Sequence, residues 1–278
     1  MVREGAARLK AAGVANAWHE AEWLLSRLVG SRPLELYLSE VRPSEAHRER
    51  FAAQIEARAF GTPLQYLLGE AEFFGRPFTV EPGVFIPRPE TEAIVEALLG
   101  TLQRDAERLA RPLRVLDLGT GSGAIAVTLA LELPACAVVG IELSWEALRT
   151  ASENVRRHGV DRRVALVRGC WLQAVRGEVD AVVSNPPYVP SRQVERLPLD
   201  VRQEPRDSLD GGRGGMRHLK RLLEDAAAVV RPGGWLALEC GEDHAVELVA
   251  RSAAAGWAPP GCPVHDLAGR PRGVLLQR

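Results

Sequence analysis

The feature that most constrains the fold is an alternation of apolar strands and helical segments, which begins at Arg114 and runs to the C-terminus. The strand candidates are residues 114–118, 137–143, 164–167, 179–184, 235–240 and 274–277. Helical patterns lie between several of them, for example over residues 124–133 and 145–158. Such an alternation predicts an α/β fold with a parallel sheet covered on both faces. Gly269 and Gly273 mark a last turn, which predicts a final antiparallel strand.

The region before this alternation has a different pattern. Apolar residues recur at helical spacing after Asn16, and a second helical run follows Ser44, so residues 1–72 are expected to form a small helical domain. Glycine and proline then punctuate short apolar pieces over residues 62–89, which predicts a β-hairpin linker, placed at residues 73–88. Residues 89–278 form the expected α/β domain.

Composition excludes several classes of protein. The 35 basic and 36 acidic residues give a formal net charge of −1, which argues against a strongly basic, DNA-binding surface. The four cysteines are far apart and the six histidines are scattered, so neither a metal site nor a disulfide framework is expected. No apolar stretch is long enough for a membrane span and no secretory segment is recognised, which predicts a cytoplasmic protein.

A glycine-rich loop follows the first strand of the α/β region and opens a helix. The loop comprises Asp117, Leu118, Gly119, Thr120, Gly121, Ser122 and Gly123, and Glu142 ends the next strand, where an acidic residue binds ribose hydroxyls in nucleotide-binding folds. The spacing fits both S-adenosylmethionine and NAD, because it also satisfies the dinucleotide pattern. The Asp117 carboxylate would oppose a pyrophosphate but suits an ammonium and a sulfonium, which favours S-adenosylmethionine.

A second motif, Asn185-Pro186-Pro187-Tyr188, follows the strand at 179–184. The two prolines fix φ and remove two N–H donors, so the Asn185 side-chain oxygen and backbone carbonyls remain as acceptors. Such a corner suits a planar NH₂ group. Two acceptors would raise the electron density on an otherwise poor nitrogen nucleophile and stabilise the positive charge that develops on it. The alternative interpretation of the tetrapeptide is a rigid turn that ends a strand.

Together these segments resemble one family, the protein-(glutamine-N5) methyltransferases of the HemK/PrmC type, which modify peptide chain release factors. The similarity runs nearly end to end. It includes the glycine loop, the tetrapeptide, a closing segment from Asp266 to Arg272, and a linker signature at residues 61–66, 69–70, 74–75 and 86–92. The resemblance implies a Rossmann-like S-adenosylmethionine-dependent methyltransferase sheet with a helical N-terminal domain that helps hold the protein substrate.

The resemblance also implies the role of each site residue. Residues Gly119, Thr120, Gly121, Ser122 and Gly123 would contact the methionine part of S-adenosylmethionine, with Asp117 nearby, Glu142 on the ribose and Trp171 beside the adenine. Asn185 would lie in the cofactor region and, with the Pro186 carbonyl, would accept hydrogen bonds from the target amide, while Pro187 and Tyr188 would contact the glutamine side chain.

The implied target is the glutamine of the Gly-Gly-Gln loop in release factors, bound by a monomer that needs neither nucleic acid nor membrane. Three positions depart from the family pattern: Glu142 replaces a common aspartate, Cys170 an acidic residue, and Gln203 an aromatic one.

Other functions remain open at this point. An adenine-N6 methyltransferase acting on DNA or RNA also needs to grip a planar amine, but its substrate calls for a basic surface. An NAD(P)-dependent oxidoreductase would leave the tetrapeptide without a role. A binding protein that uses the same fold without catalysis is a further alternative, although an acceptor site of this kind argues for catalysis.

Overall fold

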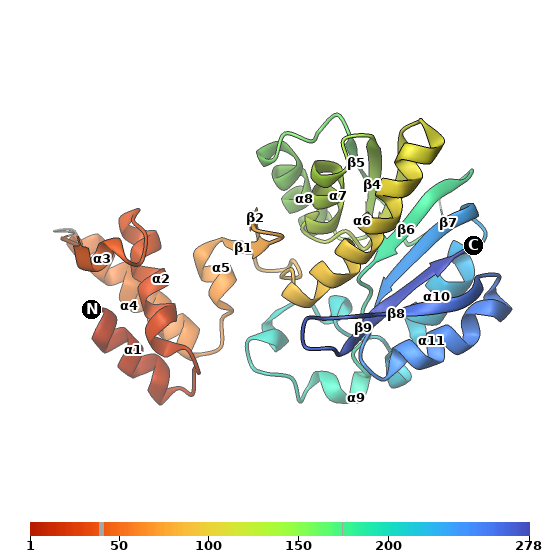
Figure 1. Cartoon of the computed structure of the whole chain (residues 1–278). Helices are drawn as coiled ribbons and strands as arrows, with labels where there is room; N and C mark the ends of the chain where they lie inside the picture. Colours follow the sequence, from red (N-terminus) through yellow and green to blue (C-terminus); the bar gives the residue numbers. More distant parts are fainter. Residues whose placement is uncertain (39–41, 174) are drawn as a thin grey trace. The chain divides into compact units, whose positions relative to one another are not determined.

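The computed structural model describes residues 1–38, 42–173 and 175–278. The chain forms two compact units (Figure 1). The first contains residues 1–71 and 198–203, and the second contains residues 72–197 and 204–278. None of the described helices has the length and apolarity needed to cross a membrane.

The first unit is helical, which confirms the expectation from the periodicity of its sequence. Its elements are α1 (Val2–Ala11), α2 (Ala17–Val29), α3 (Glu35–Leu38), α4 (Glu45–Ala59), α5 (Leu64–Leu68) and the short 3₁₀ turn η1 (Val201–Gln203). Ser44 caps α4, because its hydroxyl accepts from the backbone N–H of His47 at 3.3 Å. Leu9, Leu24 and Phe51 lie in the core shared by α1, α2 and α4. Residues 39–41 of the predicted helical stretch lie outside the described residues.

The hairpin is present, but it begins earlier than the predicted linker. Its strands are β1 (Glu70–Phe73) and β2 (Arg76–Thr79), and the apolar run at 64–68 is the helix α5. Phe74 and Gly75 form the turn with positive φ angles of 53° and 69°, the backbone that tight two-residue hairpins require. Residues 80–88 of the predicted linker contain no strand.

The second unit contains a sheet of seven strands in the order β5-β4-β3-β6-β7-β9-β8. The strands are β3 (Leu113–Leu118), β4 (Cys136–Glu142), β5 (Val164–Arg168), β6 (Val179–Ser184), β7 (Val230–Glu239), β8 (Ala258–His265) and β9 (Pro271–Gln277). The first five in this order are parallel and β9 is antiparallel to both neighbours, which confirms the predicted parallel sheet and its antiparallel end. The edge strand β8 is an element that the apolar pattern does not predict.

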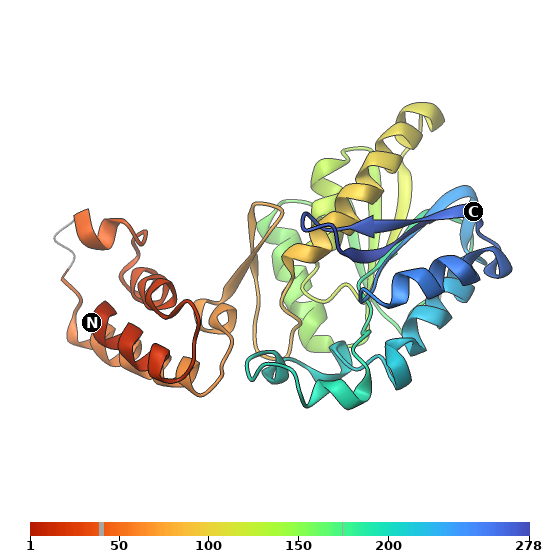
Figure 2. The ribbon, with the colours of Figure 1, turned by 60° about the horizontal axis from the view of Figure 1, so that its bottom comes forward.

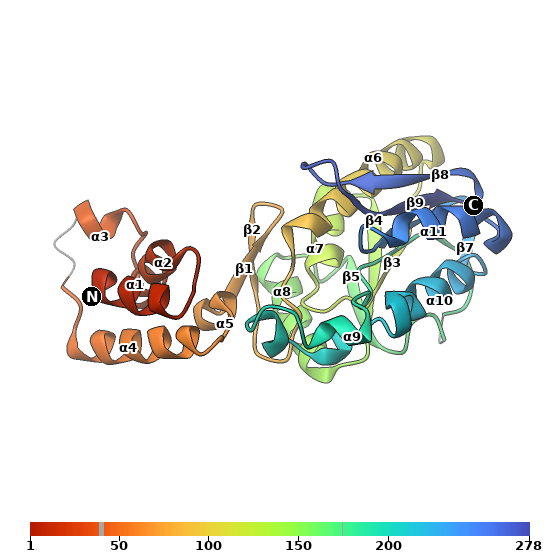
Figure 3. The same ribbon diagram turned by 90° about the horizontal axis from the view of Figure 1, so that it is seen from below.

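Helices cover both faces of this sheet, as the alternation predicts. On one face lie α6 (Pro89–Leu109), α7 (Ala124–Glu132) and α8 (Trp145–Arg157), and α6 crosses β7 and β9 (Figure 2). On the other face lie α10 (Arg217–Ala226) and α11 (His244–Ser252) (Figure 3). Short helical turns, α9 (Ser191–Val194), η2 (Arg206–Ser208), η3 (Arg213–Gly215) and η4 (Ala253–Ala255), occupy the connections.

The register brings four strand ends to one edge of the sheet. Leu118 at the end of β3 pairs with Ile141 of β4 and with Ser184 at the end of β6, and Ser184 pairs in turn with Leu238 of β7. The glycine loop, Glu142 and the tetrapeptide follow these ends directly. Parallel strands place the segments after their carboxyl ends side by side, and this is where ligands bind in open α/β sheets.

Candidate active site

A cavity of about 540 Å³ opens at this edge, entirely within the second unit. Segments that follow β3, β4, β5 and β6 all contribute to its wall. Among the lining residues are Gly119, Thr120, Gly121, Ser122, Glu142, Cys170, Trp171, Asn185 and Pro187. Its size is that of a pocket for a small organic ligand. The structure thus gathers most of the predicted site residues around one space.

The glycine loop adopts a backbone that favours glycine. Gly119, Gly121 and Gly123 have φ angles of 70°, 55° and 81°, in the region that side chains with a Cβ rarely adopt. A Cβ on Gly119 would lie 3.5 Å from the Trp171 ring, an ordinary van der Waals contact, so the positive φ and not crowding favours glycine at this position. Gly123 differs from the others, because it does not line the cavity; it precedes α7, and a Cβ there would lie 3.2 Å from Ala151.

Asp117 lies beneath the loop and is fully buried. Its Oδ2 accepts from the Thr120 hydroxyl at 2.5 Å and from the backbone N–H of Ala126 at 3.1 Å, so the carboxyl holds the loop against the first turn of α7. Burial raises the pKa of Asp117 to about 7, although both hydrogen bonds favour the charged form. Asp117 is absent from the cavity lining, and its Oδ1 has no hydrogen-bond partner among the described residues.

Glu142 projects its carboxylate along the rim of the cavity. Oε2 accepts from the backbone N–H of Gly121 at 3.0 Å, and Oε1 accepts from the N–H groups of Leu143 and Ser144 at 2.7 and 3.0 Å. These bonds fix the carboxylate as a rigid acceptor beside the glycine loop. Such a group suits a ligand that brings hydroxyl donors.

Trp171 forms another part of the wall with an unusual backbone. Its φ is 51°, although it is not a glycine, and strained backbone of this kind tends to occur at functional sites. The indole ring lies 5.3 Å from the imidazole of His218, measured between centroids, and both residues line the cavity. Cys170, one of the three residues that depart from the family pattern, lines the cavity as well.

The tetrapeptide is divided between the cavity and the protein interior. Asn185 and Pro187 line the cavity, whereas Pro186 is buried and Tyr188 is not part of the lining. The Asn185 amide Nδ2 donates to the hydroxyl of Thr91, at the start of α6, at 3.1 Å. Among the described residues no group donates to its Oδ1, so this oxygen is available as an acceptor.

Two buried acidic residues that the sequence analysis did not identify support these segments. Glu239 at the end of β7 is 1% exposed, and its Oε1 accepts from the Tyr188 hydroxyl at 2.9 Å. Glu204 accepts from the backbone N–H of Ile86 at 3.0 Å and pairs with Arg88, which joins the loop after α9 to the segment before α6. The sequence does contain a signal for Glu239: like Glu142, it is an acidic residue at the end of an apolar strand.

Comparison with known proteins identifies the relatives of this chain. Residues 76–200 match the family described as "Methyltransferase small domain", and residues 1–69 match "PrmC N-terminal domain". A release factor glutamine methyltransferase from Moorella thermoacetica is 43% identical over 99% of this chain and 96% of its own length. A protein of the same name from Bradyrhizobium diazoefficiens is 38% identical over 98% of this chain and 92% of its own length.

Solved structures agree on the fold. A methyltransferase from Pyrococcus furiosus has a TM-score of 0.52 at 20% identity, over 84% of this chain and 98% of its own. The catalytic domain of hMettl16, in complex with a MAT2A 3′UTR hairpin, has a TM-score of 0.58 at 17% identity, over 80% of this chain and 81% of its own. At these identities the likeness concerns the fold of the sheet and its helices.

Proposed function

The chain belongs to the family of release factor glutamine methyltransferases, and we propose that it methylates the side-chain nitrogen (N5) of the glutamine in the Gly-Gly-Gln motif of peptide chain release factors. S-adenosylmethionine is the proposed methyl donor. The observation that carries the proposal is the anchored amide of Asn185: its Nδ2 donates to Thr91, its oxygen accepts no hydrogen bond from the described residues, and the residue lines the same cavity as the glycine loop. An acceptor in this place matches the donor-only NH₂ group of a glutamine.

The residues around the cavity fit the proposed cofactor. The backbone of Gly119 to Ser122 permits close approach of a ligand, Glu142 offers acceptors to ribose hydroxyls, and the Trp171 ring offers a flat apolar face for adenine. When bound, S-adenosylmethionine supplies an electrophilic methyl carbon next to a sulfonium. Asp117 would act from below, by holding the loop in shape, because its carboxyl does not line the cavity.

The tetrapeptide would hold and orient the target amide. Asn185 Oδ1 would accept one hydrogen of the NH₂ group. The resemblance assigns the second hydrogen to the carbonyl of Pro186 and the packing on the glutamine side chain to the Tyr188 ring, although neither residue lines the cavity. Two acceptors stabilise the positive charge that develops on nitrogen, and a rigid proline corner holds that nitrogen in line for attack. The amide nitrogen would take the methyl group as the carbon–sulfur bond of the sulfonium breaks, which leaves a neutral thioether, and the nitrogen would release one proton to solvent. The chain's own residues would contribute the orientation and the acceptor oxygen of Asn185.

The rival functions are not favoured. The relatives that span nearly the whole chain are named for release factor glutamine methylation, and neither an adenine-N6 methyltransferase nor an NAD(P)-dependent oxidoreductase accounts for that match. The formal net charge of −1 likewise gives no support to a nucleic-acid substrate.

Mass spectrometry of a purified release factor tests the proposed function directly. After incubation with this protein and S-adenosylmethionine, we expect the peptide that contains Gly-Gly-Gln to gain the mass of one methylene, with fragment ions that place it on the glutamine. A release factor whose target glutamine is replaced by alanine is the control and should gain nothing. An unmodified wild-type peptide, or a methyl group on another residue, would contradict the proposal.

A separate prediction concerns the rim carboxylate. We expect Glu142→Ala to weaken S-adenosylmethionine binding about 10- to 100-fold, because hydrogen bonds to a charged group contribute roughly 1.5–3 kcal/mol. Isothermal calorimetry measures this directly. Glu146→Ala, which removes an exposed carboxylate from the start of α8, is the matched control and should bind as the wild type does. Equal affinities of the two variants would show that Glu142 does not contact the cofactor.

A further inference from the structure

One buried amide joins two segments of the cavity wall within the second unit. Asn154 on α8 is fully buried, and its side chain bonds three backbone groups. Its Nδ2 donates to the carbonyl of Ser122 at 2.8 Å and to that of Thr79 at 2.9 Å, and its Oδ1 accepts from the N–H of Thr79 at 2.7 Å. Both amide hydrogens and the oxygen are therefore engaged, which gives the side chain a single orientation.

The bond to Ser122 fixes the end of the glycine loop. Ser122 lines the cavity, and its carbonyl shares a peptide plane with the N–H of Gly123. That N–H donates to the carbonyl of Thr120 at 2.8 Å, so the plane is held from both sides, by the loop itself and by Asn154. Helix α8 approaches this point closely, since a Cβ on Gly123 would lie 3.2 Å from Ala151. Asn154 thus sets the direction of the last peptide before α7 begins.

The bonds to Thr79 fasten a second segment of the wall. Thr79 ends β2, and the residues that follow it include Gly83, Phe85 and Pro87, all of which line the cavity. Asn154 bonds both the N–H and the carbonyl of Thr79, so this strand end has a fixed partner on α8. One side chain therefore joins two parts of the cavity wall that are distant in the sequence.

From these contacts we infer that Asn154 is a positioning residue for the cofactor, which holds the glycine loop and the segment after β2 in the arrangement that binds S-adenosylmethionine. Asn154 does not line the cavity, so it acts through the backbone that it bonds. A wall that is already ordered costs a ligand less to bind than one that has to be ordered first. The inference rests on the proposed function, because S-adenosylmethionine is the proposed methyl donor.

Two variants of Asn154 remove different parts of this joint. Asn154→Ala removes all three hydrogen bonds. Asn154→Asp keeps the volume and the acceptor for the Thr79 N–H but offers at most one donor for two carbonyls. It decides the question if Asn154→Ala does not fold.

Two controls lie on the same helix. Thr150 is 1% exposed and its hydroxyl has no hydrogen-bond partner among the described residues, so Thr150→Val changes a buried polar residue of α8 without removing a bond. Val155→Ala removes two methyl groups from the core, which lowers stability and leaves the hydrogen bonds of Asn154 in place.

The readouts are the affinity for S-adenosylmethionine by calorimetry, kcat and KM for each substrate, and the thermal midpoint without ligand. We expect Asn154→Ala and Asn154→Asp each to weaken cofactor binding about 10-fold, the size of one buried hydrogen bond, and to raise the KM for the cofactor in proportion. At saturating cofactor, kcat and the KM for release factor should change little. Both controls should keep the wild-type affinity, although Val155→Ala should lower the thermal midpoint.

Two results would overturn the inference. The first is wild-type affinity for S-adenosylmethionine in the folded Asn154 variants. The second is an equal loss of affinity in Val155→Ala, which would show that any loss of stability weakens the site. A wild type that does not bind the cofactor would reject the inference together with the proposed function. A wild type that binds it but leaves release factor unmodified would reject the proposed function alone, and the affinities of the variants would still decide the role of Asn154.

Discussion

Replacement of Asn185 by alanine is expected to slow methyl transfer by at least about 100-fold, the usual cost of removing one group that stabilises charge in a transition state. The variant removes the oxygen that would accept from the glutamine NH₂ group. Affinity for S-adenosylmethionine should change little, because the glycine loop and Glu142 keep their own hydrogen bonds. Single-turnover methylation of release factor and calorimetry with the cofactor measure the two quantities separately.

The control for this prediction is Gln103→Ala, which removes an exposed amide from α6 in the same unit. It should methylate at the wild-type rate. A second comparison is the thermal midpoint, since Asn185→Ala also leaves Thr91 without one hydrogen bond, an effect of about 1 kcal/mol. If Asn185→Ala retains wild-type turnover, Asn185 is not the acceptor for the target amide.

Much of the fold follows from local patterns in the sequence. Apolar runs predicted β6 at its observed bounds, Val179–Ser184, and located β3, β4 and β5 closely. The start of β7 was missed because Arg231, Pro232, Gly233 and Gly234 look like a turn. The edge strand β8 was missed for a related reason: it contains three prolines, which edge strands tolerate because one side needs no ladder hydrogen bond.

Some parts of the candidate site could also be predicted from the sequence, because they are continuous motifs, and other parts could not, because they depend on contacts between residues distant in the sequence. The glycine loop and the tetrapeptide are short continuous motifs, so the sequence alone reveals them. Asp117 lies beneath the loop because its side chain points away from the cavity at the end of β3. The motif does not reveal this direction. Tyr188 and Glu239 lie on different elements, as do Asn185 and Thr91 on helix α6. Only the folded unit, with α6 packed on the sheet, brings each pair together.

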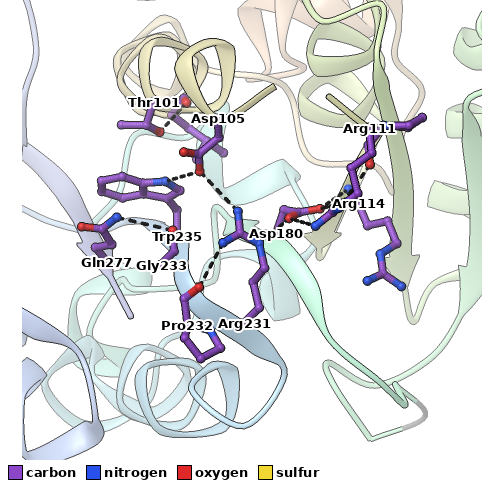
Figure 4. A network of polar contacts seen from close by, with 12 residues as sticks. Thr101, Asp105, Arg111, Arg114, Asp180, Arg231, Pro232, Gly233, Trp235 and Gln277 are labelled. Atoms are coloured by element: carbon purple, nitrogen blue, oxygen red, sulfur yellow. Dashed lines mark hydrogen bonds and ion pairs between the residues drawn. The ribbon is translucent and has the colours of Figure 1, made fainter. Parts of the chain in front are cut away.

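The largest loss of stability is expected from Asp180→Ala, at the opposite end of β6 from the tetrapeptide. Asp180 is fully buried and accepts from Arg111 at 2.7 and 2.9 Å, from Arg231 at 2.5 Å and from the backbone N–H of Arg114 at 2.8 Å (Figure 4). Arg231 also pairs with Asp105, which accepts from the indole of Trp235 at 3.1 Å. The network joins α6, β3, β6 and β7.

Removal of this carboxylate leaves the nearly buried guanidinium of Arg231 without this partner, which costs roughly 3–5 kcal/mol for a buried pair, whereas Arg111 is 38% exposed and adds little. Chemical denaturation measures the change in the free energy of unfolding. Asp161→Ala, at an exposed position, is the control and should stay within about 0.5 kcal/mol of the wild type. Because the network lies away from the cavity, the folded variant should keep the wild-type affinity for S-adenosylmethionine. A loss below about 1 kcal/mol would contradict a stabilising role.

The same carboxyl predicts a dependence of stability on pH. Burial alone would raise the pKa of Asp180, but the hydrogen bonds from Arg111, Arg231 and the Arg114 N–H outweigh it and lower the pKa from 3.8 to about 2. A group whose pKa is lowered by folding stabilises the protein at pH values above its pKa in the unfolded chain. This contribution is lost as the pH falls through its pKa in the folded protein. Between about pH 4 and pH 2 the wild type should therefore lose about 2 kcal/mol through Asp180. The difference in stability between wild type and Asp180→Asn should shrink over that interval, and a constant difference would show that the ion pairs do not hold this pKa down.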